Sequence, residues 1–392
     1  MEFRLLDEHW RPAVMSLWDY CFEQRGDPFF EWYFSRYCRL PQVMGAVQAG
    51  QLKAMAHLNP YQIRLRGNAV PAAYFVGVAT APEARGQGLF RPLLAAALAE
   101  LRRQGHGVTL LMPSAASFYR PYGFAYCYHQ WQFDCSVDQL GQLVKRRPSL
   151  SWRPATLQDD PALARVYAKA MRHRHAYVVR TSDSWQTMLA ALFAEGGAAF
   201  LAFDESNEPV ASLWFTRQNR RLQVVELLAA DATALDACLG LLHQHRSQAE
   251  QVSFRLPSDD LFYDRVPDAA WSIQLKPFMM GRIVDVERAL RQCLPPAQQL
   301  AGASLTLEVS DPLAAWNSGV WRIAYEPALS IYRTADHTPE IKISVDALAQ
   351  LCFGYYSAAQ LQSKAVLTGE PAALRRLSDW LPPCENFINE FY

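Results

Sequence analysis

The chain has 392 residues, of which 51% are hydrophobic, and its 38 basic side chains balance 38 acidic ones. This length exceeds what one hydrophobic core usually serves, so the chain is expected to fold into two or three domains. A net charge of zero argues against nucleic acid as the main partner, because phosphate backbones are bound by clustered basic residues.

Other features of the sequence concern location. The longest apolar stretch, near residues 93–99, is too short to span a bilayer. The first ten residues are charged and lack the apolar core of a signal peptide. The eight cysteines are scattered without a Cys-x-x-Cys pair, which favours reduced, packed thiols. We therefore expect a cytoplasmic protein with no membrane span.

Residues 1–147 are predicted to form an α/β domain that ends at a linker near Lys145–Pro148. An acidic cluster after the first strand precedes a helix that runs to about Glu23. Ala49-Gly50 and Gly67-Asn68 predict hairpin turns. The strands expected in this domain are Phe3–Leu6, Val43–Ala49, Gln51–Leu58, Gln62–Leu65, Val76–Thr80, Val108–Met112 and Ala125–Phe133.

Residues 28–40 are crowded with aromatic side chains. No single helical face can bury them all, and packing in the core or against another domain is the favoured interpretation. The alternative is that some of them line an acceptor cleft, where aromatic faces can hold a protonated amine. Phe29, Trp32 and Tyr33 are the candidates for that role.

The segment 76–112 predicts an anion site between a strand and a helix. Arg85-Gly86-Gln87-Gly88 follows the strand Val76–Thr80 directly. Two residues without a Cβ let several backbone N–H groups converge on one ligand, and the positive end of the helix adds to the attraction. That helix is expected from about Phe90 to Arg103, with an apolar face formed by Phe90, Leu93, Leu94, Ala97, Leu98 and Leu101.

These residues resemble the GNAT acyltransferase superfamily, whose phosphate loop reads Gln/Arg-x-x-Gly-x-Gly/Ala, here Arg85-x-x-Gly88-x-Phe90. A bulky residue at the last position is similar to the Eis-like (enhanced intracellular survival) family. Further matches to that family are the runs Ser117–Phe124 (SFYRPYGF), Met280–Val286 (MGRIVDV) and Phe353–Ala358 (FGYYSA). The resemblance covers nearly the whole chain.

The resemblance implies acetyl-CoA as co-substrate, and the residues of the loop fit its pyrophosphate. We expect the backbone amides of Arg85, Gly86, Gln87, Gly88 and Leu89 to bind the phosphates. By resemblance, Val78, Ala79 and Thr80 present backbone groups to the pantetheine arm. The alternative is a tight turn between strand and helix with no ligand.

Tyr119 is the candidate general acid. A departing CoA sulfur carries negative charge, and a phenol that titrates near 10 can donate a proton to a thiolate whose acid titrates at about 8.5. The residues alone leave packing as an equal alternative, and the match to the family's general acid, just ahead of Arg120, favours catalysis.

A base is expected at the α-carboxylate of Tyr392, because the resembled family places its C-terminal carboxylate in the active site. The alternative is a tail that only packs against the protein.

Residues 148–281 repeat the plan of the first domain faintly. Trp152–Asp160 echoes the opening, and predicted strands at Ala198–Phe203, Val210–Phe215 and Val224–Ala229 echo the early ones. Residues Ala230–Thr233 then lack the glycine pair and arginine, which predicts a degenerate GNAT-like domain.

Residues 282–392 are predicted to form strands followed by helices, which indicates an α+β domain. The resemblance identifies this domain as sterol-carrier-protein-like.

The resulting hypothesis is an acetyl-CoA-dependent N-acetyltransferase that acts on a primary amine by direct transfer in a ternary complex. A non-catalytic acyl-CoA sensor or small-ligand or lipid carrier is the alternative. The family also implies a homo-oligomer, and hexamers occur in it. His173/His175 and His243/His245 do not indicate a metal site, because residues two apart on a helix point to different faces and no cysteine or carboxylate set completes either pair. They are expected on solvated helix faces instead. We predict no metal.

Overall fold

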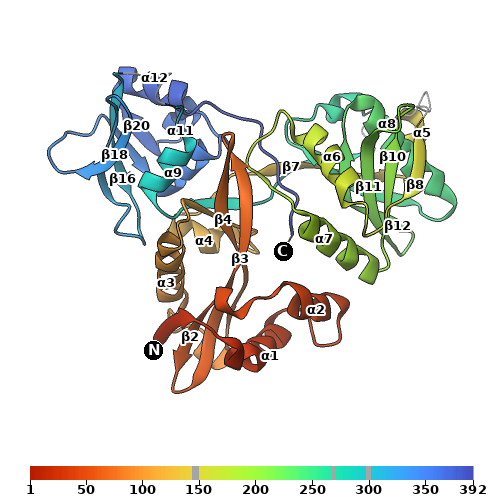
Figure 1. Cartoon of the computed structure of the whole chain (residues 1–392), viewed down its shortest axis with the longest axis horizontal. Helices are drawn as coiled ribbons and strands as arrows, with labels where there is room; N and C mark the ends of the chain where they lie inside the picture. The colour runs from red at the N-terminus through yellow and green to blue at the C-terminus, as the bar shows by residue number, and fades with distance from the viewer. Residues whose placement is uncertain (144–149, 267–270, 297–301, 392) are drawn as a thin grey trace. The chain divides into compact units, whose positions relative to one another are not determined.

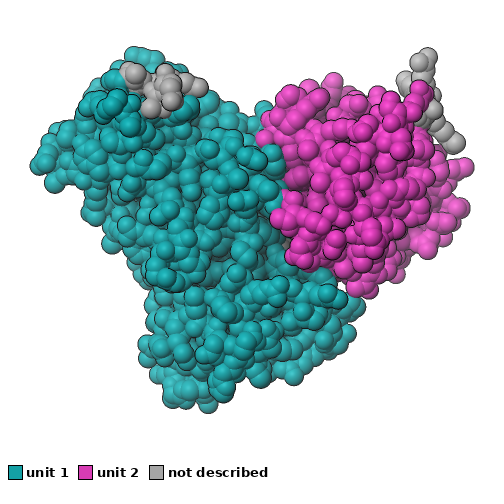
Figure 2. Space-filling view, in the orientation of Figure 1, with its two compact units in different colours: residues 1–128, 175–179, 278–392 teal, residues 129–174, 180–277 magenta. Residues whose placement is uncertain are grey.

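The computed structural model describes residues 1–143, 150–266, 271–296 and 302–391 (Figure 1). The linker predicted at Lys145–Pro148 lies outside these residues. The chain divides into two compact units, coloured separately in Figure 2. The first unit comprises residues 1–128, 175–179 and 278–392, and the second comprises residues 129–174 and 180–277.

The first unit contains a sheet built mainly from the N-terminal third of the chain. Its strands lie in the order β1 (Glu2–Leu5), β2 (Val43–Gln48), β3 (Gln51–Leu65), β4 (Asn68–Thr80), β5 (Val108–Leu111), β15 (Met280–Ile283) and β6 (Ala125–Tyr126), with β9 (Tyr177–Val178) paired to β3. The β4–β5 pair is parallel and the other neighbours are antiparallel. Its helices and short helical turns are η1 (Glu8–Trp10), α1 (Arg11–Cys21), α2 (Pro28–Trp32), η2 (Tyr33–Tyr37), η3 (Leu40–Gln42), η4 (Pro82–Ala84), α3 (Phe90–Arg103), α4 (Ala116–Tyr119) and η5 (Arg120–Tyr122).

Helix α3 crosses from β4 to β5 and covers the sheet with the apolar face that its sequence predicts. The side chains of Leu93, Leu94, Ala97, Leu98 and Leu101 are buried in one cluster with residues of β2, β3, β4 and β5. Burial of each large aliphatic side chain contributes about 1.5–3 kcal/mol. This packing fixes the start of α3 beside the end of β4.

The prediction of one strand over Ala125–Phe133 is wrong, because two strands in different sheets take its place. The chain forms β6 and then β7 (His129–Ser136), and β7 belongs to the sheet of the second unit. Between the two strands, the amides of Cys127 and Tyr128 both donate to the carbonyl of Met279. Alternating hydrophobicity identifies an extended segment but not the strand with which it pairs.

The second unit has its own sheet and core. Its strands lie in the order β14 (Ser272–Pro277), β7, β13 (Gln251–Pro257), β12 (Arg221–Ala229), β11 (Pro209–Gln218), β10 (Ala198–Phe203) and β8 (Ser151–Pro154). The β12–β13 pair is parallel, like β4–β5, which fits the predicted repeat. Its helices are α5 (Leu140–Leu143), α6 (Asp160–Met171), α7 (Ser182–Ala194), α8 (Ala232–Gln244), η6 (His245–Ser247) and η7 (Phe262–Arg265).

The histidine at position 175 departs from the sequence prediction. Helix α6 ends at Met171, so His175 does not lie on a solvated helix face. It is buried in the first unit, where its Nε2 lies 2.8 Å from the carbonyl oxygen of Phe353 and its Nδ1 accepts from the amide of Arg66. Burial lowers the pKa of His175 to about 4.

The C-terminal part of the first unit forms a further sheet in the order β18 (Leu329–Thr334), β17 (Gly319–Tyr325), β16 (Ser304–Ser310), β19 (Ile341–Ser344) and β20 (Leu367–Gly369). Helices α9 (Val286–Cys293), α10 (Val345–Cys352), α11 (Ala358–Ser363) and α12 (Pro371–Trp380) accompany it, so the predicted α+β arrangement is confirmed. Its core is continuous with residues of β3, β4 and β5. The C-terminal part and the first sheet therefore share one hydrophobic core.

Candidate functional site

The predicted anion loop joins β4 to α3 and has the backbone that its glycines predict. Gly86 and Gly88 have φ of +73° and +71°, the left-handed region that glycine adopts at least cost. A Cβ on either residue would meet no atom within 4 Å, so the space beside the loop is open. No side chain caps the start of α3 among the described residues. The first N–H groups of a helix have no intrahelical partner, and those of α3 lie at the end that joins the loop.

Two side chains fix the shape of this loop. The Arg85 guanidinium donates to the carbonyl of Thr80 at 3.2 Å and lies over the ring of Tyr20. The Gln87 amide donates to the carbonyl of Glu83 at 3.0 Å. Both side chains therefore donate to backbone carbonyls of the chain itself.

The end of β4 presents an edge beside the loop. β4 pairs with β5 only from Ala72 to Phe75, whereas its pairing with β3 continues to Thr80. Val78, Ala79 and Thr80 therefore lie beyond the β4–β5 ladder. Gly77, with φ +56°, forms a bulge there, and such bulges bend a strand away from its neighbour. An extended ligand could add to this edge as a strand does.

Tyr119 lies against the first residue of α3. Its buried ring meets the ring of Phe90 edge to face, with centroids 5.8 Å apart, and packs on Phe124 at 6.0 Å. Burial raises the pKa of Tyr119. The phenol is therefore protonated at neutral pH and can donate a proton or a hydrogen bond. The fold thus brings Tyr119 to the N-terminal end of α3, beside the predicted anion loop.

The C-terminal tail approaches the same region. Phe387 and Ile388 are buried, in line with the apolar composition of the tail. The hydroxyl of Tyr74, on β4, donates to the carbonyl of Phe391 at 3.1 Å. The pKa of Tyr74 is raised by burial first, and also by nearby groups that include Glu390 and Tyr119. Tyr392, the expected base, lies outside the described residues.

Glu390 is a carboxylate that the sequence reasoning missed. It is buried, and its charge contributes to the raised pKa values of Tyr37, Tyr61 and Tyr74, although burial is the larger cause for each. The signal was present, because Glu390 is an acidic residue in a tail that also carries Phe387, Ile388 and Phe391. A buried carboxylate among tyrosines can hold a cation.

The aromatic segment 28–40 forms a packed cluster over β3. Tyr33 is fully buried, stacks on Trp18 with centroids 4.5 Å apart, and places its hydroxyl 2.9 Å from Nδ1 of His57. Trp32 is buried, and Phe29 is half-buried against both Trp32 and Tyr33. Packing accounts for Tyr33, and Phe29 is the more accessible of the candidates.

The corresponding junction in the second unit is built differently. β12 ends at Ala229 and α8 begins at Ala232, so few residues are left to form a loop. The Asp231 side chain accepts from the amide of Ala234 at 2.9 Å and caps the helix. A carboxylate of the chain therefore occupies the position that an anion would need.

The described residues offer no metal centre. Within the described ranges, no group of three or more His, Cys, Asp or Glu side chains is placed to hold a metal ion. Within the same ranges, no helix has both the length and the apolar character needed to cross a membrane. The loop, Tyr119 and the tail remain the candidate site.

The family profiles agree with this architecture. An acetyltransferase (GNAT) domain matches residues 2–127, a second acetyltransferase (GNAT) domain matches residues 176–283, and a sterol carrier protein domain matches residues 286–389. The chain is therefore a tandem GNAT-domain protein with a C-terminal sterol carrier protein domain. No curated protein sequence matches it.

Solved structures share the fold over the whole chain. A probable N-acyltransferase from Enterococcus faecalis has a TM-score of 0.86 at 22% identity, covering 100% of this chain and 99% of its own. A GCN5-related N-acetyltransferase from Anabaena variabilis has a TM-score of 0.84 at 21% identity, covering 100% of both chains. Eis1 from Mycobacterium abscessus has a TM-score of 0.76 at 19% identity, again covering 100% of both chains.

Proposed function

We propose that the chain is an acetyl-CoA-dependent N-acetyltransferase that acetylates a primary amine by direct transfer in a ternary complex. The observation that carries the proposal is the contact between Tyr119 and Phe90, which places a protonated phenol at the start of α3 beside the glycine loop. Acetyl-CoA needs both features, because its pyrophosphate binds helix N-termini and its sulfur leaves as a thiolate.

The roles of the residues follow from this arrangement. The amides of the 85–89 loop would bind the pyrophosphate, and the edge of β4 at residues 78–80 would bind the pantetheine arm. The amine nitrogen attacks the thioester carbonyl, the carbon–sulfur bond breaks, and Tyr119 donates its proton to the departing sulfur. Holding both substrates in place supplies much of the rate enhancement.

The proton lost by the amine needs an acceptor near Tyr119. We assign it to the α-carboxylate of Tyr392, because the preceding residue, Phe391, already lies against Tyr74 on β4. Glu390 supplies a counter-charge for an ammonium group in the same region. An acceptor with more than one amine would suit this pair of negative charges.

The test is release of CoA thiol from acetyl-CoA against a panel of amines, with Tyr119→Phe and Tyr126→Phe measured in parallel. Tyr126 lies on β6 and is half-buried, so its phenylalanine variant controls for loss of a phenol in the same region. We expect Tyr119→Phe to lose about 100-fold or more in kcat, with acetyl-CoA affinity close to that of the wild type.

The outcomes separate enzyme from sensor. Turnover in Tyr119→Phe equal to that of the wild type would remove Tyr119 from the mechanism. Saturable binding of acetyl-CoA without release for any amine would instead support a non-catalytic acyl-CoA sensor. Appending residues after Tyr392 tests the base, because the α-carboxylate then no longer belongs to residue 392.

A further inference from the structure

Arg282, within the run MGRIVDV, makes a buried ion pair that the proposed mechanism leaves unused. It lies on β15, and its side chain and that of Asp311 are both 0% exposed. Its Nη2 donates to Asp311 at 2.7 Å, its Nε donates to the carbonyl of Tyr122 at 2.7 Å, and its Nη1 donates to the carbonyl of Ile283. Burying a charged guanidinium costs desolvation free energy, and hydrogen bonds to three different acceptors offset that cost.

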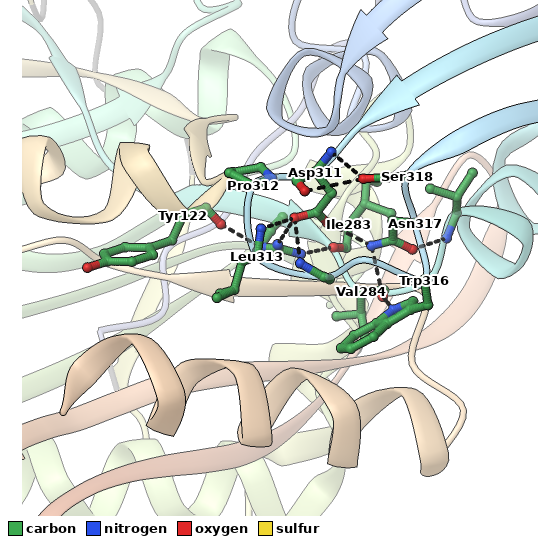
Figure 3. Close-up of polar contacts among 12 residues, drawn as sticks. Tyr122, Ile283, Val284, Asp311, Pro312, Leu313, Trp316, Asn317 and Ser318 are labelled. Carbon is green, nitrogen blue, oxygen red and sulfur yellow. Dashed lines mark hydrogen bonds and ion pairs between the residues drawn. The ribbon is translucent and has the colours of Figure 1, made fainter. Parts of the chain in front are cut away.

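Asp311 ties this arginine to the sterol carrier protein domain. Its Oδ1 also accepts from the amides of Leu313 and Ala314, at 2.9 and 2.8 Å, and its Oδ2 accepts from the side chain of Asn317 at 2.9 Å. Figure 3 shows Asp311 at the centre of these contacts. The carboxylate therefore holds the segment that follows β16 in one conformation.

Asn317 extends the same network back toward β15. Its Oδ1 accepts from the amide of Val286 at 3.1 Å, and its Nδ2 lies 3.3 Å from the carbonyl oxygen of Val284. The indole of Trp316 donates to that carbonyl at 2.9 Å (Figure 3). The sterol carrier protein domain thus fixes the strand that carries Arg282.

On its other side, Arg282 holds the segment of Tyr119. The carbonyl that accepts from its Nε belongs to Tyr122, three residues after Tyr119. Its guanidinium carbon lies 6.0 Å from the ring centroid of Phe124, and that ring is 6.0 Å from the ring of Tyr119. The backbone at Gly123 has little room to move, because it packs closely on α10: a Cβ on Gly123 would lie 2.6 Å from the side chain of Val345.

We infer that Arg282, held by Asp311 of the sterol carrier protein domain, is a positioning residue for Tyr119. This inference rests on the proposed function. Arg282 does not touch the reacting atoms. It fixes the turn and the ring against which Tyr119 packs, and a proton donor displaced by about 1 Å can lose 100-fold in rate.

The test is a double-mutant cycle on kcat. The double variant Arg282→Met/Asp311→Asn removes both charges, which avoids burying one of them without its partner. It is made in the wild type and in Tyr119→Phe, and rates are divided by the number of acetyl-CoA binding sites titrated in each preparation. We expect kcat to fall about tenfold with Tyr119 present and to change less than about twofold in Tyr119→Phe.

The matched control is Arg102→Gln. Arg102 also joins the first GNAT domain to the start of α9, through Asp285 at 2.7 Å, but its side chain is half exposed. It should leave kcat unchanged in both backgrounds. Equal losses of kcat in both backgrounds for Arg282→Met/Asp311→Asn would show that Arg282 supports the fold alone and would overturn the inference.

A second readout does not depend on turnover. The 19F resonance of 3-fluorotyrosine incorporated at position 119 should move or split in Arg282→Met/Asp311→Asn and stay in place in Arg102→Gln. An unchanged resonance in the double variant contradicts positioning. If the wild type shows no amine-dependent release, the proposed function fails, and the resonance alone then decides whether Arg282 positions Tyr119. Should the double variant not fold, Arg282→Lys takes its place, because an ammonium on that stem cannot donate to all three acceptors at once.

Discussion

Replacing Gly88 by alanine tests whether the loop before α3 binds an anion. Gly88 has φ +71°, and a Cβ there would meet no atom of the chain within 4 Å. The substitution therefore adds no clash within the protein. Its cost to folding is the left-handed backbone penalty of about 1–2 kcal/mol.

The effect of Gly88→Ala on acetyl-CoA binding should be larger than its cost to folding, and the two effects can be measured separately. An N–H hydrogen bond to a charged phosphate is worth about 1.5–3 kcal/mol. Loss of one such bond would raise the dissociation constant about 10- to 100-fold, because each 1.4 kcal/mol is a factor of ten. Gly86→Ala, with φ +73° and the same open space, should behave alike.

Gly67→Ala is the matched control for both variants. Gly67 has φ +84° and open space around it, but it lies in the turn between β3 and β4. All three variants should lose similar stability in thermal unfolding. Titration calorimetry with acetyl-CoA should find weaker binding only for Gly86→Ala and Gly88→Ala. If Gly88→Ala binds acetyl-CoA as tightly as Gly67→Ala, the loop is a turn that does not bind the phosphates.

Two further predictions concern stability. A Cβ at Gly77 would lie 2.3 Å from the ring of Trp18. Gly77→Ala should therefore lose about 1–3 kcal/mol of stability from overpacking, in addition to the backbone penalty that Gly67→Ala also carries. A melting temperature of Gly77→Ala equal to that of Gly67→Ala would contradict this. Burial lowers the pKa of His175 from 6.5 to about 4, so the unfolded chain takes up the proton first as the pH falls. The contribution of His175 to stability should then be full above pH 6.5 and fall by about 3 kcal/mol toward pH 4. Urea unfolding of His175→Gln should therefore show a shallower fall than the wild type.

The local parts of the site could be predicted from the sequence. The glycine loop and the apolar face of α3 depend on residues close together in the chain, so turn chemistry and helical spacing were sufficient. The two glycines have the left-handed conformation that the loop requires. The role of Tyr119 stays a prediction, although its ring does lie beside Phe90.

The non-local parts could not be predicted in the same way. β15 inserts between β5 and β6, and β9 pairs with β3, although each comes from a distant part of the chain. A short apolar run does not reveal its partner strand. His175 was misplaced for the same reason, since its burial depends on Phe353 and Arg66. Likewise, the charge of Glu390 gained meaning only when the tail was seen beside Tyr74.

The two GNAT domains differ at the same crossover, and the difference bears on the proposed anion site. In both, a strand leads through a helix to a parallel neighbour, as β4–α3–β5 and as β12–α8–β13. Residues 81–89 separate β4 from α3, whereas residues 230–231 separate β12 from α8. A short connection cannot wrap around a phosphate, and the Asp231 carboxylate already accepts from the helix. A capping carboxylate and an anionic ligand compete for the same N–H groups, because both are drawn to the positive end of the helix. Removing Asp231 alone would therefore not create a site in the second domain, since the loop would still be missing.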